Sequence, residues 1–112
     1  MAKITTHVLD TARGKPAAGI AVSLERKDGA AFVLVRSGTT DDDGRQRTLT
    51  DPDGVPVGTY RLSFALEAYF AQQGLPAFFP EAQLTFVVRS AADHFHVPLL
   101  LSPFGYTTYR GS

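Results

Sequence analysis

Three histidines and an arginine are the residues of this chain best suited to chemistry at neutral pH. His7 lies near the start, and His94 and His96 occupy alternate positions of an apolar segment near the end. An imidazole titrates closer to neutrality than any other side chain, so each of these can accept or donate a proton. Arg110 stands two residues before Ser112, the last residue of the sequence. We expect this end to be ordered and to contribute to a site, although most chain ends fray in solvent.

None of the motifs around these residues identifies a reaction alone. His94 and His96 could hold a metal ion, since alternate strand positions project side by side, but no third ligand follows in a recognisable pattern. The acidic segment 41–43 indicates a tight turn before Arg45 and lacks the remaining ligand spacing of a calcium loop. Ser112 has no nucleophile elbow around it. The sequence therefore predicts neither a metal nor a cofactor.

Composition excludes several classes of protein. Eleven basic and eleven acidic side chains cancel, and no basic stripe suits a nucleic acid. The chain has no cysteine, which excludes disulfides, thiolate metal sites and thiol nucleophiles and is consistent with a reducing compartment. No signal peptide and no membrane-spanning apolar run is visible. We expect a soluble, cytoplasmic protein made of a single domain over residues 1–112, with no nucleic-acid or membrane partner.

Most of the chain shows the two-residue alternation of β-strands. In the clearest segment, Tyr60, Leu62 and Phe64 alternate with polar or small residues. The predicted strands cover 4–9, 20–24, 32–35, 45–49, 60–66, 84–88, 94–101 and 106–110. Only 67–73 has helix-forming composition, and Gly74 follows it as a stop signal. The sequence predicts an all-β sandwich of about eight strands in two sheets with one short helix.

Alternation also predicts which way the histidines point. We assign Ile4 and Val8 to the core, which turns His7 to the outer surface of its sheet. Near the end of the chain, assigning Phe95 to the core turns His96 outward in the same way. The two imidazoles can therefore leave the core on one outer surface.

Apolar side chains share that outer surface with the histidines. By the same alternation, Leu9, Pro98 and Leu100 point outward with them. A contiguous apolar patch is unfavourable when it faces water, and such patches often mark contacts between subunits. We therefore expect a second copy of the chain to cover this surface.

Five segments in combination carry a resemblance to a known family. They are Thr6–Asp10, Gly14–Ala17, Asp43–Arg45, His94–Pro103 and Tyr109–Ser112. Together they closely resemble the 5-hydroxyisourate hydrolase family, the transthyretin-related enzymes of urate breakdown. The terminal tetrapeptide is the most specific of them, because transthyretin, the hormone carrier on the same fold, ends differently. The resemblance implies a transthyretin-like sandwich of two four-stranded sheets, and a homotetramer whose outer sheets line a central channel.

The resemblance also implies a reaction. Members of this family hydrolyse the ring of 5-hydroxyisourate to 2-oxo-4-hydroxy-4-carboxy-5-ureidoimidazoline, which is cyclic amide hydrolysis. The reaction needs a base for water, stabilisation of an oxyanion and a clamp on a planar, polar substrate. We assign His7 and His96 jointly to water activation and proton transfer, leaving open which of them is the base. Arg45 suits the oxyanion, since its planar fork is permanently charged.

The end of the chain is assigned to substrate binding. Arg110 is predicted to clamp the substrate, and Ser112 to accept hydrogen bonds through either its hydroxyl or the terminal carboxylate. Tyr109 is predicted to shape the pocket, although packing against a neighbouring subunit explains it equally well. His94 is kept as a residue that supports the site without touching the substrate.

Two other interpretations remain. In the first, the protein is a transthyretin-like carrier whose channel binds an aromatic ligand without turning it over. Burying two arginines and two histidines in such a channel is costly unless they have a use. In the second, the chain is a non-catalytic sandwich used for protein interaction. The concentration of ionisable groups near the end of the chain argues against that.

We predict that a tag fused after Ser112 lowers activity more than the same tag fused before Met1. The extra residues would remove the carboxylate and crowd the site, whereas the other end carries no predicted site residue. Turnover of the two tagged proteins at equal concentration is the measurement. Equal rates would show that the end of the chain is not part of the site.

Overall fold

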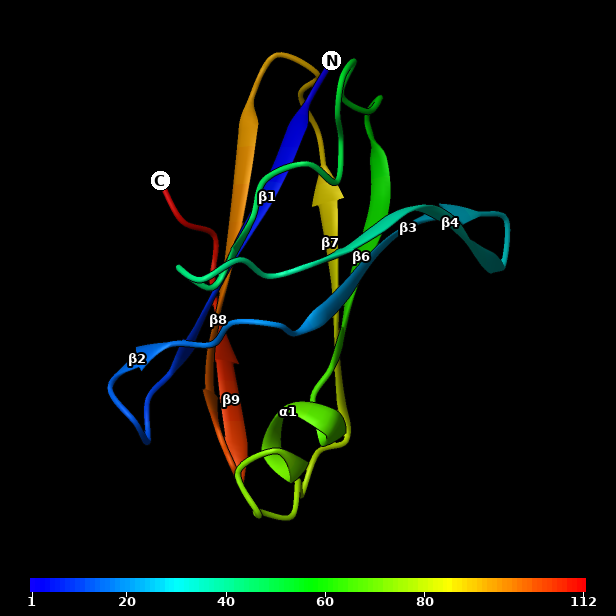
Figure 1. Ribbon diagram of the computed structural model, residues 1–112. Coiled ribbons are helices and arrows are strands. Elements are labelled where there is room, and N and C mark those ends of the chain that lie inside the picture. The colour runs from blue at the N-terminus through cyan, green and yellow to red at the C-terminus, as the bar shows by residue number, and fades with distance from the viewer.

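Two β-sheets packed face to face form the body of the protein in the computed structural model, which describes residues 1–112 (Figure 1). The elements are β1 (Lys3–Asp10), β2 (Lys15–Pro16), β3 (Ala21–Asp28), β4 (Ala31–Thr39), β5 (Arg45–Gln46), β6 (Gly58–Ala65), α1 (Glu67–Ala71), β7 (Glu81–Val88), β8 (His94–Ser102) and β9 (Gly105–Thr108). The first sheet has the order β2-β1-β8-β9, with β5 also paired to β1, and the second has the order β4-β3-β6-β7. The predicted all-β sandwich with one short helix is confirmed.

The structure differs from the sequence prediction at the ends of several elements. The strand predicted over 45–49 stops at Gln46, whose side-chain Oε1 accepts hydrogen bonds from the backbone N–H and the hydroxyl of Thr48 and so turns the chain away. The helix predicted over 67–73 ends at Ala71 and leads into a turn that closes at Gly74, where φ is 71°. The short strand β2 was not predicted, and with β5 it gives the first sheet five strands instead of four.

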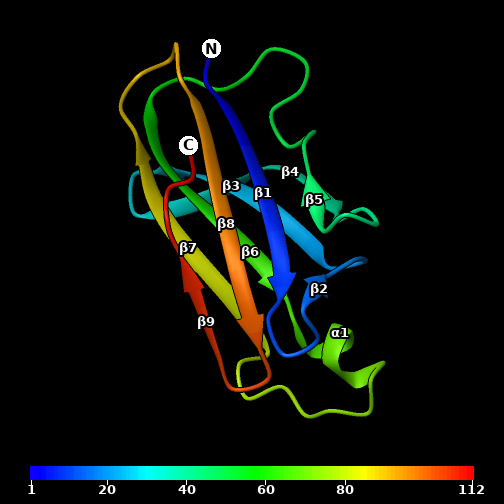
Figure 2. The same ribbon diagram turned by 90° about the vertical axis from the view of Figure 1, so that its left-hand side faces the viewer.

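Strands β1 and β8 run parallel and side by side in the first sheet, where Ile4 pairs with Phe95 and Thr5 with His96 (Figure 2). Buried side chains alternate with half-exposed ones along β1, and along β8 except at Pro98, which was expected to be exposed on the outer face but is buried in the single chain. The core-facing residues are Ile4, Val8, Phe95, Val97, Leu99 and Leu101. This alternation leaves His7 and His96 on the outer face, as predicted. No helix in the structure has the length and apolarity needed to span a bilayer.

A tight turn attaches β5 to the free edge of β1. The carboxylate of Asp41 accepts hydrogen bonds from the backbone N–H groups of Asp43 and Arg45 at 2.9 and 3.0 Å. Gly44 reverses the chain with a φ of 73°, a conformation that other residues rarely adopt. The carbonyl of Gly44 then accepts a hydrogen bond of 2.7 Å from the N–H of Val8. The turn thereby fixes the position of Arg45, the first residue of β5, against β1.

We predict that Gly44→Ala destabilises the protein more than Gly29→Ala does. Both glycines have positive φ, so an alanine at either position carries backbone strain of about 1–2 kcal/mol. Only at position 44 would the new Cβ also clash with the backbone, against the carbonyl oxygen of Val8. The measurement is the free energy of unfolding in urea. An equal loss in the two variants would contradict the tight packing of this turn on β1.

Candidate functional site

His7 and Arg45 are neighbours on adjacent strands of the outer face. The antiparallel pairing of β1 with β5 sets them directly opposite each other, and both are half-buried. Cross-strand partners have Cβ atoms about 4.5–5.5 Å apart, so the guanidinium and the imidazole share one environment. Two residues far apart in the sequence thus place a permanent positive charge beside an imidazole that can accept a proton.

A polar hollow of about 270 Å³ opens on this face. Its lining contains no hydrophobic residue and comes from β1, from β5 and the residue that follows it, from β8 and from the end of the chain. The lining residues are Thr5, Thr6, Arg45, Arg47, His94, His96 and Ser112. A hollow lined by hydroxyls, imidazoles and guanidinium groups suits a small, polar and planar molecule.

The end of the chain reaches this hollow because it continues alongside β8 (Figure 2). The N–H of Gly111 donates a hydrogen bond of 2.7 Å to the carbonyl of His96. A side chain at Gly111 would meet the imidazole, since a Cβ there would lie 2.8 Å from Cδ2 of His96. The glycine therefore allows the close contact that brings Ser112 beside His96.

The surroundings keep both histidines neutral. Partial burial lowers the pKa of His96 below its usual 6.5, and the charges of Arg45, His7 and His94 lower it further. Burial followed by the charge of Arg45 also lowers the pKa of His7, while the backbone and carboxylate of Asp43 oppose the shift. Both imidazoles are therefore unprotonated at neutral pH and can act as bases.

His7 has one ring nitrogen without a partner. Its Nε2 is buried and makes no hydrogen bond to any protein group. A buried polar atom left in this state costs about 1–3 kcal/mol, so its persistence points to a water or ligand as the missing partner. His7 itself is not among the residues that line the hollow, although a proton on His7 would lower the pKa of His96.

The structure does not bring Tyr109 and Arg110 into this hollow. Tyr109 is 57% exposed. The Arg110 guanidinium lies 4.4 Å from the ring centroid of Phe95, and its nearest acidic partner is the carboxylate of Asp93 at 4.0 Å. Both residues border a different hollow, of about 170 Å³, between β7 and β9. Their assignment to substrate binding stays a prediction.

Thr5, Thr6 and Arg47 line the hollow and were not predicted as site residues. Thr5 contacts two histidines at once, because its Oγ1 lies 2.8 Å from Nε2 of His94 and 2.8 Å from Nδ1 of His96. A signal for Thr5 was present in the sequence, since it shares the outward face of its strand with His7. His94 is exposed and also lines the hollow, so its role as a residue that does not touch the substrate stays a prediction.

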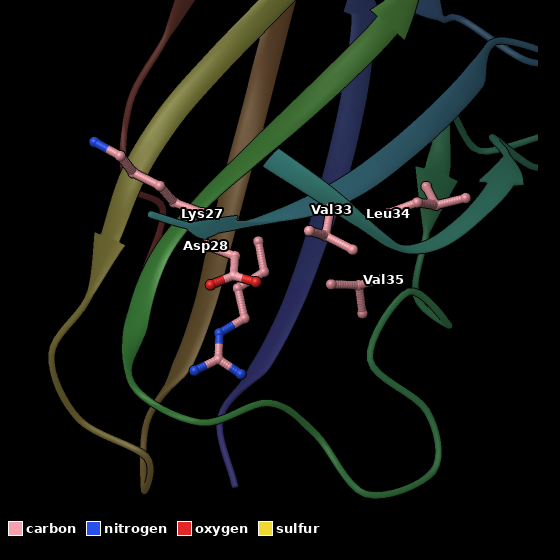
Figure 3. Close-up of a pocket in the computed structure, with 6 residues that line it drawn as sticks. Lys27, Asp28, Val33, Leu34 and Val35 are labelled. Atoms are coloured by element: carbon pink, nitrogen blue, oxygen red, sulfur yellow. The ribbon is translucent and has the colours of Figure 1, made fainter. Parts of the chain in front are cut away.

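The other concave surfaces contain no histidine. The hollow beside the β3–β4 hairpin encloses about 370 Å³, and Figure 3 shows Lys27 extending away from Val33 and Val35, which lie across it. It contains no imidazole and no hydroxyl. No group of three or more histidine or acidic side chains in the structure is arranged to hold a metal ion. The hollow beside His96 is therefore the candidate site.

Known proteins share both this sequence and this architecture. Residues 4–111 match the family model described as the HIUase/Transthyretin family. The chain is 46% identical to 5-hydroxyisourate hydrolase of Caulobacter vibrioides over 116 residues, covering 100% of both proteins. The structure of Klebsiella pneumoniae 5-hydroxyisourate hydrolase matches with a TM-score of 0.88 and 38% identity over 100% of both chains. Transthyretin from Sparus aurata matches with a TM-score of 0.91 and 31% identity, over 97% and 96% of the two chains.

We predict that Arg45→Gln raises the pKa of both His7 and His96 toward 6.5, because it removes a cation that disfavours each imidazolium. Arg47→Gln is the matched control, since Arg47 pairs with Asp41 at 3.2 Å and does not lower either pKa. The measurement is the NMR titration of the imidazole protons. If both variants shifted His96 equally, Arg45 would not be the dominant charge at the site.

Proposed function

This chain belongs to the HIUase/Transthyretin family, and from that membership we propose that it hydrolyses 5-hydroxyisourate to 2-oxo-4-hydroxy-4-carboxy-5-ureidoimidazoline in urate degradation. The observation that carries the proposal is the polar hollow in which Arg45 and His96 lie beside the His7–Arg45 strand pair. Its groups match what a cyclic amide requires of a hydrolase. The reaction consumes only water, so the proposal needs no cofactor.

The histidines carry the proton transfers in this proposal. Water adds to a ring carbonyl carbon, the C–N bond breaks, and the departing nitrogen gains a proton. One imidazole accepts a proton from the attacking water and the other gives a proton to the departing nitrogen. The first ring then releases its extra proton to solvent and the second regains one from solvent, so both return to the neutral form. Lowered pKa values support this use, because a base must be unprotonated before the reaction starts.

Arg45 stabilises the negative charge that develops on the carbonyl oxygen. Its guanidinium is permanently charged, lines the hollow and is half-buried, which strengthens its electrostatic effect relative to a fully solvated side chain. Losing a donor of this kind typically lowers turnover by about 10²–10³-fold. Ser112, which lines the same hollow, binds the polar edge of the substrate through its hydroxyl or its carboxylate.

We further propose that the working enzyme is a homotetramer whose channel is lined by the outer face of the first sheet. Leu9 and Leu100 on that face remain partly exposed in the single chain, which supports cover by another copy. Tyr109 and Arg110, which do not reach the hollow of their own chain, would then contribute from subunit contacts. The cytoplasmic location stays a prediction.

We predict that His7→Ala, His96→Ala and Arg45→Ala each remove most of the activity, by about 10²-fold or more, while the fold survives. All three side chains lie on the outer face and contribute nothing to the core cluster. The measurement is the ultraviolet decay of freshly generated 5-hydroxyisourate with each protein and without protein. Circular dichroism and sedimentation compare each variant with the unmodified chain.

The controls separate this proposal from a carrier. Arg36→Ala, on the exposed edge strand β4, should keep full turnover. Decay accelerated by the unmodified chain but not by the three variants would support the hydrolase. If the unmodified chain left the decay unchanged, the transthyretin-like carrier would be favoured instead. Near-normal turnover in folded variants would show that the catalytic groups lie elsewhere.

A further inference from the structure

The hydroxyl of Thr5 lies between two imidazoles at equal distances. It is 2.8 Å from Nε2 of His94 and 2.8 Å from Nδ1 of His96. The parallel pairing of β1 with β8 sets Thr5 directly opposite His96, so this contact is fixed by the sheet rather than by a mobile loop. His94 is exposed and His96 is half-buried, and both line the hollow. The three side chains form a continuous hydrogen-bonded path from solvent to the candidate site.

A single hydroxyl proton couples the protonation of the two rings. Thr5 can donate to only one nitrogen at a time, so the other nitrogen must carry a proton and donate to the hydroxyl oxygen. When Thr5 donates to Nδ1 of His96, the neutral imidazole carries its proton on Nε2. That arrangement leaves an N–H group of His96 for the contents of the hollow. Thr5 thus couples the tautomer of His96 to that of His94.

We propose that Thr5 is a positioning residue that links His94 to His96 as a proton relay during hydrolysis. The inference rests on the proposed function and assigns His96 the task of protonating the departing nitrogen. His96 gives up the proton on Nε2 and receives the Thr5 hydroxyl proton on Nδ1. Thr5 takes the Nε2 proton of His94, and His94 gains a proton from solvent water at Nδ1, leaving a hydroxide that the proton accepted by His7 neutralises. After the product leaves, the chain runs in reverse: His96 takes a proton from water at Nε2, and His94 returns its Nδ1 proton to solvent. Every N–H or O–H bond that breaks is matched by one that forms.

The electrostatics of the hollow favour such a relay. A protonated His96 would carry positive charge beside Arg45, which is one reason why its pKa is lowered. Receiving a proton on Nδ1 while losing one from Nε2 lets His96 act as an acid without becoming an imidazolium. His7, whose buried Nε2 has no protein partner, is then the ring left to accept a proton from water.

The test compares Thr5→Val, which keeps the shape of the side chain but removes the hydroxyl, with Thr5→Ser, which restores it. A valine favours a strand, so β1 should persist. Thr59→Val is the matched control, since Thr59 is a half-buried threonine on β6 in the other sheet. We expect Thr5→Val to lower kcat about tenfold with little change in KM, a part of the 10²–10⁴-fold that proton transfer typically contributes. Thr5→Ser and Thr59→Val should retain kcat.

His94→Ala tests the outer end of the path. We expect a similar loss of kcat, partial recovery on adding imidazole to the buffer, and no further loss when His94→Ala is combined with Thr5→Val, because both break one chain. Full kcat in Thr5→Val, or losses that multiply in the double variant, would overturn the relay.

Nitrogen-15 NMR of the imidazoles tests the coupling without substrate. In the unmodified chain, His96 should hold its proton on Nε2, and Thr5→Val should abolish that preference. A mixture of tautomers unaffected by Thr5→Val would overturn the positioning role even in an active enzyme. An unmodified chain that does not hydrolyse 5-hydroxyisourate would instead refute the proposed function, while the NMR result would still decide whether Thr5 positions His96.

Discussion

The parallel pairing of β1 with β8 is the interaction on which the rest of the site depends. It joins the first strand to a strand some ninety residues later and aligns Thr5 with His96 and His7 with Pro98. β5 attaches to one side of this pair and the end of the chain to the other, so Arg45 and Ser112 approach the histidines from opposite sides. Non-local contacts of this kind lose much chain entropy, and the apolar core beneath them must compensate for that loss.

The same two strands serve the core and the site through their alternation. Ile4 and Phe95 pack inward with the core cluster, while the histidines between core positions face outward. A substitution on the outer face therefore leaves the core intact, which separates chemistry from stability in this fold. A shift of either strand by one residue would turn its core side chains outward and its outward side chains inward, and would disrupt the core and the site together. The buried face thus holds the register that the site requires.

Local patterns in the sequence predicted the strand content and the outward direction of His7 and His96, because alternation depends only on neighbouring residues. They could not place Arg110, whose guanidinium stacks over Phe95 near the core side of the sheet and not beside Arg45. The contact of Thr5 with two histidines was equally hidden, since it exists only once β1 and β8 are paired. The length of β5 depended on the Gln46 side chain turning the chain back.

The placement of Arg45 beside two imidazoles reconciles opposing demands. A cation next to a base lowers its pKa and so weakens it as a proton acceptor. The same cation adds to the effect of burial in favouring the unprotonated base, and in the proposed reaction it would stabilise the oxyanion of the transition state. A group that only bound a neutral aromatic ligand would gain nothing from this arrangement and would still bear the cost of partly burying the charge. The electrostatics therefore favour a hydrolase over a carrier on a fold that both share.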